Sequence, residues 1–293
     1  MMTRHDKRAK REKKPATILR LAWHWGYQPG RVMREVLEWL EVLVVAGLIA
    51  GFILAFVTVR MHVPTDSMWP TINGDRSILR ADSFFVDRLT YHFRDPTPGS
   101  IVVFRHTDNV SVRHVEPGSR ADLAGVPEGA ILRYVNREGA FTAPLVEEYI
   151  AGLPSGSRVT LMTSEAIWYD LGTMENVGTT LADLGITLRE KRIRYVKRLV
   201  AVGGQTVQIK DGDIYVDGER LDDPRFDRDY VSDDEAFRFG IEPTLVPEDH
   251  YFMLGDNSAH SFDSRYWGFV DDRDIIGVPY LRVWPLPRFG LLR

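Results

Sequence analysis

The stretch PTDSMWPT, from Pro64 to Thr71, is the part of this 293-residue chain on which the interpretation of the rest depends. Pro64 and Pro70 fix their own φ angles and favour extended backbone in the residues that precede them. We therefore predict that Ser67 lies in an extended, non-helical segment. Taken alone, the pattern favours an exposed proline-rich loop. A serine is a weak nucleophile unless a neighbouring base takes its proton.

A long apolar run lies just before this stretch. Residues 42–59 form a run of 18 residues that only Thr58 interrupts, which is close to the ~20 residues needed to cross a hydrocarbon core of ~30 Å. We predict a helix that starts near Arg31 and spans the membrane over residues 37–60; a buried core helix is the alternative. Residues 16–27 fit an interfacial segment and a short soluble helix equally well.

The charge of the chain is distributed unevenly. Residues 1–36 carry ten Lys or Arg against three Asp or Glu, a charge of +7, which leaves −11 of the total of −4 on the remainder. Positive charge before a transmembrane helix is typical of the cytoplasmic side. We expect a basic cytoplasmic tail over 1–36, a single-pass protein of the cytoplasmic (inner) membrane, and an extracytoplasmic domain after Arg60. The distribution favours membrane topology over nucleic-acid binding.

Several classes of chemistry lose their usual sequence support. The chain has no cysteine and eight histidines, none of them in an HExxH pattern. It also lacks a GxSxG elbow, a P-loop and a dinucleotide fingerprint. We therefore expect no metal and no cofactor, and no disulfide is available.

Runs rich in β-branched and aromatic residues predict a mainly β fold. Asp211-Gly212 and Asp217-Gly218 are typical hairpin turns and predict a β-meander. The predicted strand segments are residues 77–80, 83–89, 100–104, 193–202, 206–221 and 250–258.

The pattern changes between residues 112 and 174. The predicted order is a strand from Val112, a Pro-Gly turn, a short helix over 121–124, a strand ending in Val-Asn, a helix within 141–153 and strands over 158–163 and 166–174. This order resembles a bacterial PDZ domain, and we predict an inserted α+β PDZ-like domain with linker over 107–190. The apolar-Gly-apolar loop of such domains is absent ahead of the first strand, and Leu184-Gly185-Ile186 comes after the last instead. A peptide-binding role and a purely structural role are therefore equally open.

Lys197 is a candidate base for Ser67. A lysine can take a proton from serine if burial lowers its pKa enough to keep it neutral. In the segment RYVKRLVAV, strand alternation places Lys197 and Arg198 on opposite faces. From the residues alone, a solvated lysine at a sheet edge is the commoner arrangement.

Four segments in this order resemble the successive boxes of type I signal peptidase, a membrane-bound Ser-Lys protease. They are PTDSMWPT, GSIVVF, YVKRLVAVGG and LGDNSAHSFDSRYWGFV. The resemblance implies a β-rich catalytic domain formed by residues 61–106 and 191–293, with the PDZ-like domain inserted between the two parts. The boxes depart from the usual pattern at Ala201, Gly203 and Gln205, and at Pro98-Gly99-Ser100.

The resemblance implies a role for each matching residue. Ser67 matches the nucleophile, Lys197 the general base, and Thr65 the hydroxyl that assists the Ser67 N–H in the oxyanion hole. Ser261 matches the serine that orients the lysine amine, and Met68 a residue that lines the substrate cleft. Asp263 and Arg265 match a salt-bridged pair, and Asp256 and Asn257 its supporting loop. The family does not require a histidine at the position of His260.

The activity that the resemblance implies is removal of signal peptides from exported preproteins after a small residue, as in Ala-x-Ala. The expected partners are preproteins, membrane lipid and a peptide or protein ligand of the insert, without nucleic acid. One alternative is a membrane-anchored PDZ-type scaffold with a dormant protease domain. Another is a Ser-Lys protease with one dedicated substrate, although a DNA-binding helix pair of the repressor type is missing.

Overall fold

The computed structural model describes residues 16–53, 57–231 and 237–292, and its contacts divide the chain into the units Met1–Thr58 and Val59–Arg293. The helices are α1 (Thr17–His24), α2 (Arg31–Phe52), α3 (Arg120–Leu123), α4 (Ala143–Ala151) and α5 (Ser264–Trp267). Single 3₁₀ turns are η2 (Asp66–Met68), η3 (Thr90–His92), η4 (Pro224–Phe226), η5 (Ser258–His260), η6 (Asp272–Asp274) and η7 (Leu286–Arg288).

The strands belong to one large and one small sheet. They are β1 (Thr58–His62), β2 (Ser83–Asp87), β3 (Ile101–Val115), β4 (Ile131–Val135), β5 (Glu138–Gly139), β6 (Arg158–Thr163), β7 (Trp168–Thr173), β8 (Ile186–Val202), β9 (Thr206–Lys210), β10 (Asp213–Val216), β11 (Glu219–Arg220), β12 (Thr244–Leu245), β13 (His250–Leu254), β14 (Val270–Asp271), β15 (Ile275–Trp284) and β16 (Gly290–Leu291). The prediction of a mainly β fold is confirmed.

The first unit is a pair of helices. The backbone N–H groups of Thr17 and Ile18, which start α1, donate to the Glu41 carboxylate of α2 at 2.9 and 2.7 Å. The Arg34 guanidinium lies 5.5 Å from the centre of the Trp23 ring. Residues 16–27, left open by the sequence, thus contain a helix whose free N–H groups are satisfied by its neighbour.

The predicted membrane helix over 37–60 is wrong at its C-terminal end. A helix does begin at Arg31 as expected, but α2 ends at Phe52 and Thr58 already belongs to strand β1. Ile53 and Val57 have π-helical backbone, and the β-branched pair Thr58-Val59 begins the strand. Residues 54–56 lie outside the described part. Within the described ranges, none of the helices combines the length and apolarity required to traverse a bilayer. None of the α2 residues is buried.

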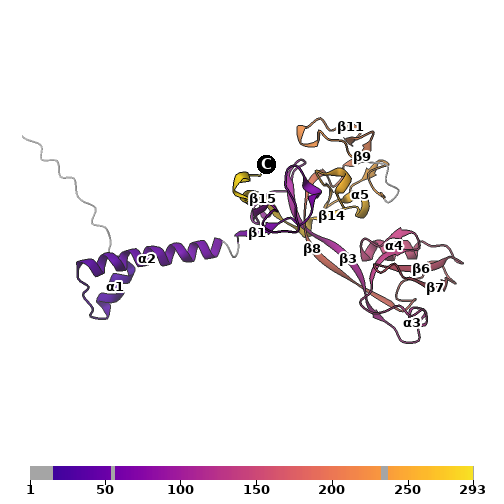
Figure 1. Ribbon diagram of the computed structural model, residues 1–293, viewed down its shortest axis with the longest axis horizontal. Helices are drawn as coiled ribbons and strands as arrows, with labels where there is room; N and C mark the ends of the chain where they lie inside the picture. The colour runs from indigo at the N-terminus through magenta and orange to yellow at the C-terminus, as the bar shows by residue number, and fades with distance from the viewer. Residues whose placement is uncertain (1–15, 54–56, 232–236, 293) are drawn as a thin grey trace, which may run out of the picture. The chain divides into compact units, whose positions relative to one another are not determined.

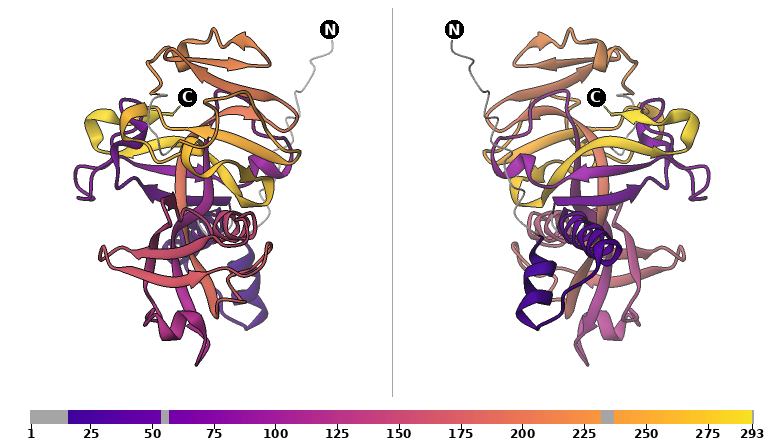
Figure 2. Two further views of the ribbon diagram at one scale, coloured as in Figure 1. Left: turned by 90° about the vertical axis from the view of Figure 1, so that its right-hand side faces the viewer. Right: turned by 90° about the vertical axis from the view of Figure 1, so that its left-hand side faces the viewer.

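A long two-stranded ribbon organises the second unit. β3 and β8 pair antiparallel from Ile101 opposite Arg198 to Val115 opposite Ile186, and Figure 1 and Figure 2 show them side by side. The sequence predicted strands over residues 100–104 and 193–202 and another from Val112, but not that they form one continuous ribbon. Both strands continue through the predicted limits of the insert, with shifts of register between Thr107 and Asn109 and between Val112 and His114.

The segment between β3 and β8 has its own hydrophobic core. Its residues come from β3, β8 and everything between them, including Ala121, Leu132, Ile150 and Leu161. The elements α3, β4, β5, α4, β6 and β7 follow in the predicted order. The limits 107–190 and the PDZ-like character stay predictions.

Two further expectations about local structure had opposite outcomes. Asp211, Gly212, Asp217 and Gly218 all have positive φ, and the predicted hairpins join β9 to β10 and β10 to β11. The predicted strand over 77–80 is wrong. Asp75 accepts from the Ser77 N–H at 2.7 Å, and the Ser77 carbonyl accepts from Arg80 and Ala81, so a side chain closes a turn here.

Candidate active site

Ser67 lies in a tight turn rather than in the predicted extended segment. Residues 66–68 form the 3₁₀ turn η2, preceded by Thr65 in an extended conformation. The turn is held by the loop after β13, because the Asn257 N–H donates to the Ser67 carbonyl at 3.0 Å and the Asn257 amide donates to the Asp66 carbonyl at 3.1 Å. The two prolines restrict the flanks of the turn, and these long-range bonds decide its shape.

The Ser67 side chain is 6% exposed and its hydroxyl has one hydrogen-bond partner in the described part of the chain. The Thr65 hydroxyl donates to Ser67 Oγ at 3.4 Å. A serine oxygen that accepts this bond keeps its own proton available for a base.

Lys197 lies inside β8, opposite Val102 of β3, and is 2% exposed. Its amine donates to Ser261 Oγ at 3.0 Å. Burial lowers the pKa of Lys197 to about 8; the Asp263 carboxylate raises the pKa and the Arg265 guanidinium lowers it. A neutral amine is therefore accessible near neutral pH, which is the requirement for a lysine base.

The predicted alternation along β8 is present. Arg198, the next residue, points to other partners, and its guanidinium forms two bonds of 2.8 and 2.7 Å with the Asp256 carboxylate. A third bond, of 2.7 Å, goes to the Gly99 carbonyl. Lys197 and Arg198 thus hold two different points of the same loop, Ser261 and Asp256.

Gly255 brings the two serine segments together. A Cβ atom at this position would lie 2.1 Å from Ser261 Oγ and 2.5 Å from the Ser67 carbonyl oxygen. The glycine backbone therefore occupies the space between the nucleophile turn and the serine that contacts Lys197. Among the described residues, the hydrogen bond of the Lys197 amine goes to Ser261 and not to Ser67.

Asp263 and Arg265 form a fully buried ion pair at 2.9 Å. Asp263 also accepts from the Gly255 N–H at 3.1 Å and caps helix α5 through the Arg265 N–H. Arg265 donates to the Ser258 carbonyl at 2.7 Å and to the Ser261 carbonyl at 3.5 Å. The pair closes the loop that carries Ser261, and its supporting role in catalysis stays a prediction.

Sequence reasoning missed two members of this network. Arg228 donates to the Asp256 carbonyl at 2.9 Å and to the Thr71 hydroxyl at 3.3 Å, and the Thr71 hydroxyl donates to the Asp256 carboxylate. Thr71 is the last residue of the PTDSMWPT stretch, but no motif in the sequence around Arg228 identifies it as a site residue. Asp256 thereby joins the nucleophile segment to β8.

Two other candidates are placed clearly. Met68 is fully buried in a core cluster with Met61 and Val63, so its role as a cleft residue stays a prediction. His260 is exposed and is the last residue of the 3₁₀ turn η5.

His106 is a buried residue that the sequence did not single out. Its ring lies 4.0 Å from the Trp267 ring and 5.7 Å from the Tyr195 ring, and burial lowers its pKa to about 3, with Arg192 and Lys197 adding to the effect. A neutral imidazole at His106 adds no positive charge to the surroundings of Lys197.

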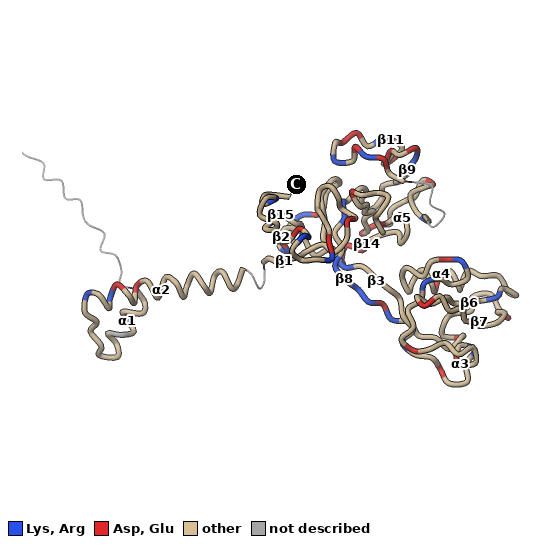
Figure 3. Tube along the Cα trace, in the orientation of Figure 1, with Lys and Arg blue, Asp and Glu red and all other residues tan. Residues whose placement is uncertain are grey.

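A groove of about 650 Å³ is lined by residues of β1, β3 and β8 and by Pro64. Its walls are Arg60, Met61, His62 and Pro64 on one side, and Arg105, Arg192, Ile193 and Arg194 on the other. Pro64 and Arg194 each precede a site residue, Ser67 and Lys197, by three positions. The groove is basic, and Figure 3 shows the run of basic residues on β8.

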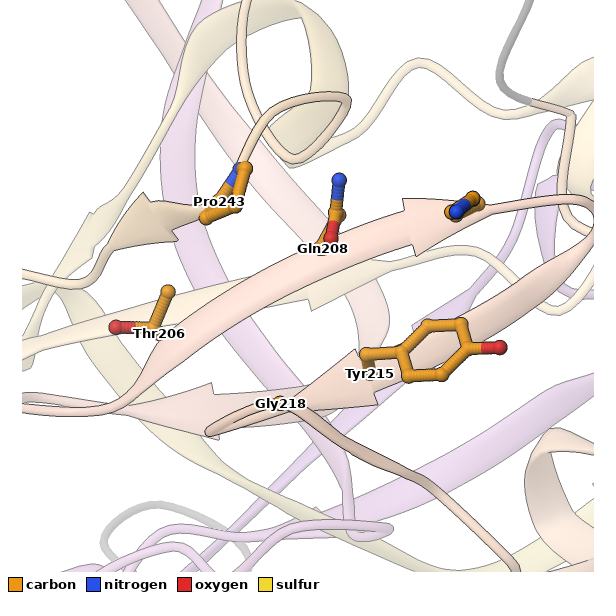
Figure 4. A pocket seen from close by; sticks show the side chains of 6 residues that line it. Thr206, Gln208, Tyr215, Gly218 and Pro243 are labelled. Carbon is orange, nitrogen blue, oxygen red and sulfur yellow. The ribbon is translucent and has the colours of Figure 1, made fainter.

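A second hollow, of about 270 Å³, lies over the small sheet (Figure 4). Its lining residues are Thr206, Gln208, Lys210, Tyr215, Gly218 and Pro243. Among the described residues, its lining combines one lysine, Lys210, with no serine and no carboxylate.

Known proteins are similar in sequence to this chain over most of its length. A probable signal peptidase I from Synechocystis sp. is 25% identical over 257 residues, which covers 87% of this chain and 77% of its own. The signal peptidase I of Mycobacterium tuberculosis is 28% identical over 285 residues, 91% of this chain and 79% of its own. A crystal structure of a signal peptidase I from Enterococcus faecalis matches at 33% identity over 29% of this chain and 81% of that one, with a TM-score of 0.24.

A family model described as signal peptidase, peptidase S26, matches residues 36–284. This range includes Ser67, Lys197 and the loop from Gly255 to Arg265. Since the match covers well over half of the chain, the protein belongs to the signal peptidase family, peptidase S26.

Proposed function

We propose that this chain is the serine endopeptidase that removes signal peptides from exported preproteins, with Ser67 as nucleophile and Lys197 as general base. Membership of the signal peptidase family supports the reaction. The observation that carries the residue assignment is the hydrogen bond of 3.0 Å from the buried Lys197 amine to Ser261, beside a serine turn held by the same loop.

In this mechanism the neutral Lys197 amine takes the Ser67 proton as Oγ attacks the carbonyl of the scissile bond. The Ser67 N–H and the Thr65 hydroxyl stabilise the negative oxygen that forms, a contribution made only in the transition state. The protonated amine then gives its proton to the leaving nitrogen. Water hydrolyses the acyl-enzyme with the same amine as base.

The basic groove is the proposed site for the residues that precede the cut. An extended peptide there would lie between residues 61–64 and 193–194, which precede Ser67 and Lys197 by three positions at their nearest. The family implies small side chains at the first and third positions before the cut, as in Ala-x-Ala. The buried surroundings of Ser67, including Met68, agree with a narrow site.

Substitution of each member of the pair tests this assignment. Ser67→Ala and Lys197→Ala should each lower kcat for a preprotein by at least ~10³-fold, because either change removes the reacting group. Lys191→Ala, on an exposed lysine of the same strand, and Ser164→Ala are matched controls that should keep full activity. Full activity of either site variant would refute the Ser-Lys assignment.

We also propose that the protein is held at the cytoplasmic (inner) membrane by its N-terminal segment, with the N-terminus inside and the catalytic unit outside. The apolar residues of α2 from Val42 to Phe52 are exposed, and a basic segment precedes them. Such an arrangement suits a substrate that is itself in the membrane, with lipid as partner. Proteolysis of intact inverted vesicles tests the topology: cleavage of the catalytic unit from the cytoplasmic face would contradict it.

A second candidate function is peptide binding by a PDZ-like insert. Within the described part of the chain, residues 186–190 of β8 pair with β3 along one edge, and their other edge has no strand partner. Helix α4 lies near them, because the Ala143 N–H donates to the Glu190 carboxylate at 2.7 Å. An unpaired edge beside a helix can accept an added strand. Peptides with a free C-terminus should bind the full chain and their amidated forms should not; equal binding of both would contradict it.

A further inference from the structure

The segment between β3 and β8 touches the loop that carries Ser261 through aromatic rings. Phe141, between β5 and α4, lies 5.3 Å from the Phe262 ring and 5.9 Å from the Tyr266 ring, in edge-to-face geometry at both. Edge-to-face pairs at such distances are favourable beyond the area that they bury. The contact joins residues more than a hundred positions apart in the chain.

An ion pair accompanies the rings. The Arg238 guanidinium donates to the Glu138 carboxylate of β5 and lies 5.9 Å from the centre of the Phe141 ring. The Arg238 N–H donates to the Arg265 carbonyl at 2.8 Å. Arg238 therefore contacts both the inserted segment and the backbone of α5.

The position of Phe141 is fixed from its own side. A Cβ atom at Gly139 would lie 2.2 Å from the Phe141 ring, so the ring packs directly on the β5 backbone. Glu138 and Phe141 thus form one contact surface, and only a glycine at 139 leaves room for it.

The catalytic groups lie on the opposite side of the contacted loop. Ser261 and Asp263, on either side of Phe262, are 5% and 0% exposed and face Lys197 and Arg265. Phe262 is partly exposed and turns to Phe141. Movement of Phe262 therefore moves Ser261, the hydrogen-bond partner of the lysine amine.

We propose that Glu138 and Phe141 of the inserted segment are positioning residues for catalysis, which hold Phe262 and Arg238 so that Ser261 stays aligned on Lys197. This inference rests on the proposed Ser-Lys mechanism. The proposal gives the insert a role in turnover. A ligand that displaces the contact would change kcat and leave KM for the preprotein nearly unchanged.

Charge reversal of the ion pair tests the proposal on the full-length protein in detergent with a preprotein substrate. Glu138→Arg and Arg238→Glu should each lower kcat about tenfold, with KM changed less than twofold. The double variant should regain most of the loss, because it restores an ion pair of opposite polarity. Glu175→Gln, which breaks the Glu175–Arg120 pair within the insert, is the matched control and should keep the parent kcat.

The pH profile separates positioning from a general loss of structure. If the loop loosens, water reaches Lys197, its pKa rises from about 8 towards 10.5, and the rise of kcat/KM should move to higher pH. Phe141→Ala should show the same shift, with a thermal midpoint close to that of the parent. A variant that only unfolds part of the insert would lose active protein without moving the profile.

The outcomes are distinguishable from failure of the proposed function. Single variants with parent kcat and parent pH profile would overturn the positioning role, as would a double variant no better than the two single ones. If Ser67→Ala also kept its activity, the Ser-Lys assignment itself would be wrong. An inactive Ser67→Ala with a fully active Glu138→Arg would overturn the positioning role alone.

Discussion

Arg198 and Asp256 form a buried, bidentate ion pair, 2.8 and 2.7 Å long, directly beside the proposed general base. Arg198 is 2% exposed and Asp256 3%. The pair ties β8 to the loop after β13, and Thr71 and Arg228 extend it to the nucleophile segment. The geometry of Ser67, Lys197 and Ser261 therefore depends on charges that take no part in the reaction.

Removal of Arg198 should be strongly destabilising. In Arg198→Ala the negative charge of Asp256 stays buried and loses most of the positive charge that balances it. Loss of one partner of a buried ion pair costs ~3–5 kcal/mol. The control is Arg273→Ala, whose solvent-screened pair with Asp271 should contribute far less to the free energy of unfolding. Chemical unfolding measures both free energies; equal small losses would show that the buried pair does not hold the site.

The activity should rise with pH through the pKa of Lys197. Only the neutral amine accepts the Ser67 proton, and burial lowers the pKa to about 8. We expect kcat/KM to fall about tenfold per unit below pH 8 and to level off above it. A profile already flat between pH 6 and 9 would contradict a lysine base with this pKa.

The same shift makes stability depend on pH. The pKa of Lys197 is lowered from 10.5 to about 8 in the folded protein, so between these values the unfolded chain binds more protons and stability rises with pH. Below pH 8 the buried amine costs ~3 kcal/mol, from ~1.4 kcal/mol per unit. The cost disappears as the pH approaches 10.5.

Lys197→Met should therefore raise the thermal midpoint more at pH 7 than at pH 10. The loss of the bond to Ser261 applies at every pH and cancels in this comparison. Lys191→Met, on an exposed lysine of the same strand, should show no such dependence. A pH-independent difference for Lys197→Met would mean that the amine is not desolvated.

The charge of the groove should influence which preproteins are cleaved well. Arg60, Arg105 and Arg194 line it, and none of the three forms an ion pair with another described residue. A substrate with glutamate four to six residues before the cut should have a lower KM than its lysine counterpart. Arg194→Glu should reverse this preference and leave kcat unchanged. Equal KM values for both substrates in both enzymes would place the peptide elsewhere.

Much of the local structure could be predicted because local chemistry decides it. Asp211-Gly212 and Asp217-Gly218 form hairpins because both residues of each pair accept positive φ. The Ser77 turn was missed because an aspartate side chain, two residues away, satisfies the backbone where a strand was expected. The end of α2 was missed because apolar character continues past Phe52 while β-branched residues begin the next strand.

The candidate site was predictable where motifs are contiguous and not where contacts are distant. Ser67, Lys197, Ser261 and the Asp263–Arg265 pair lie in recognisable segments, and the structure gathers them around one loop. Arg228 reaches Asp256 from a segment with no motif. The contact of Phe141 with Phe262 depends on how two long strands place the insert, which a periodic pattern does not encode.

Gly255 provides the most local test of the site. A methyl group there would lie 2.1 Å from Ser261 Oγ and 2.5 Å from the Ser67 carbonyl oxygen, so Gly255→Ala must push the two segments apart. We expect kcat to fall at least ~10²-fold, since small misplacements of reacting groups have effects of this size. Gly30→Ala, where a Cβ meets nothing within 4 Å, is the control and should keep full activity. Parent-like turnover by Gly255→Ala would show that Ser67 and Ser261 do not need this separation for catalysis.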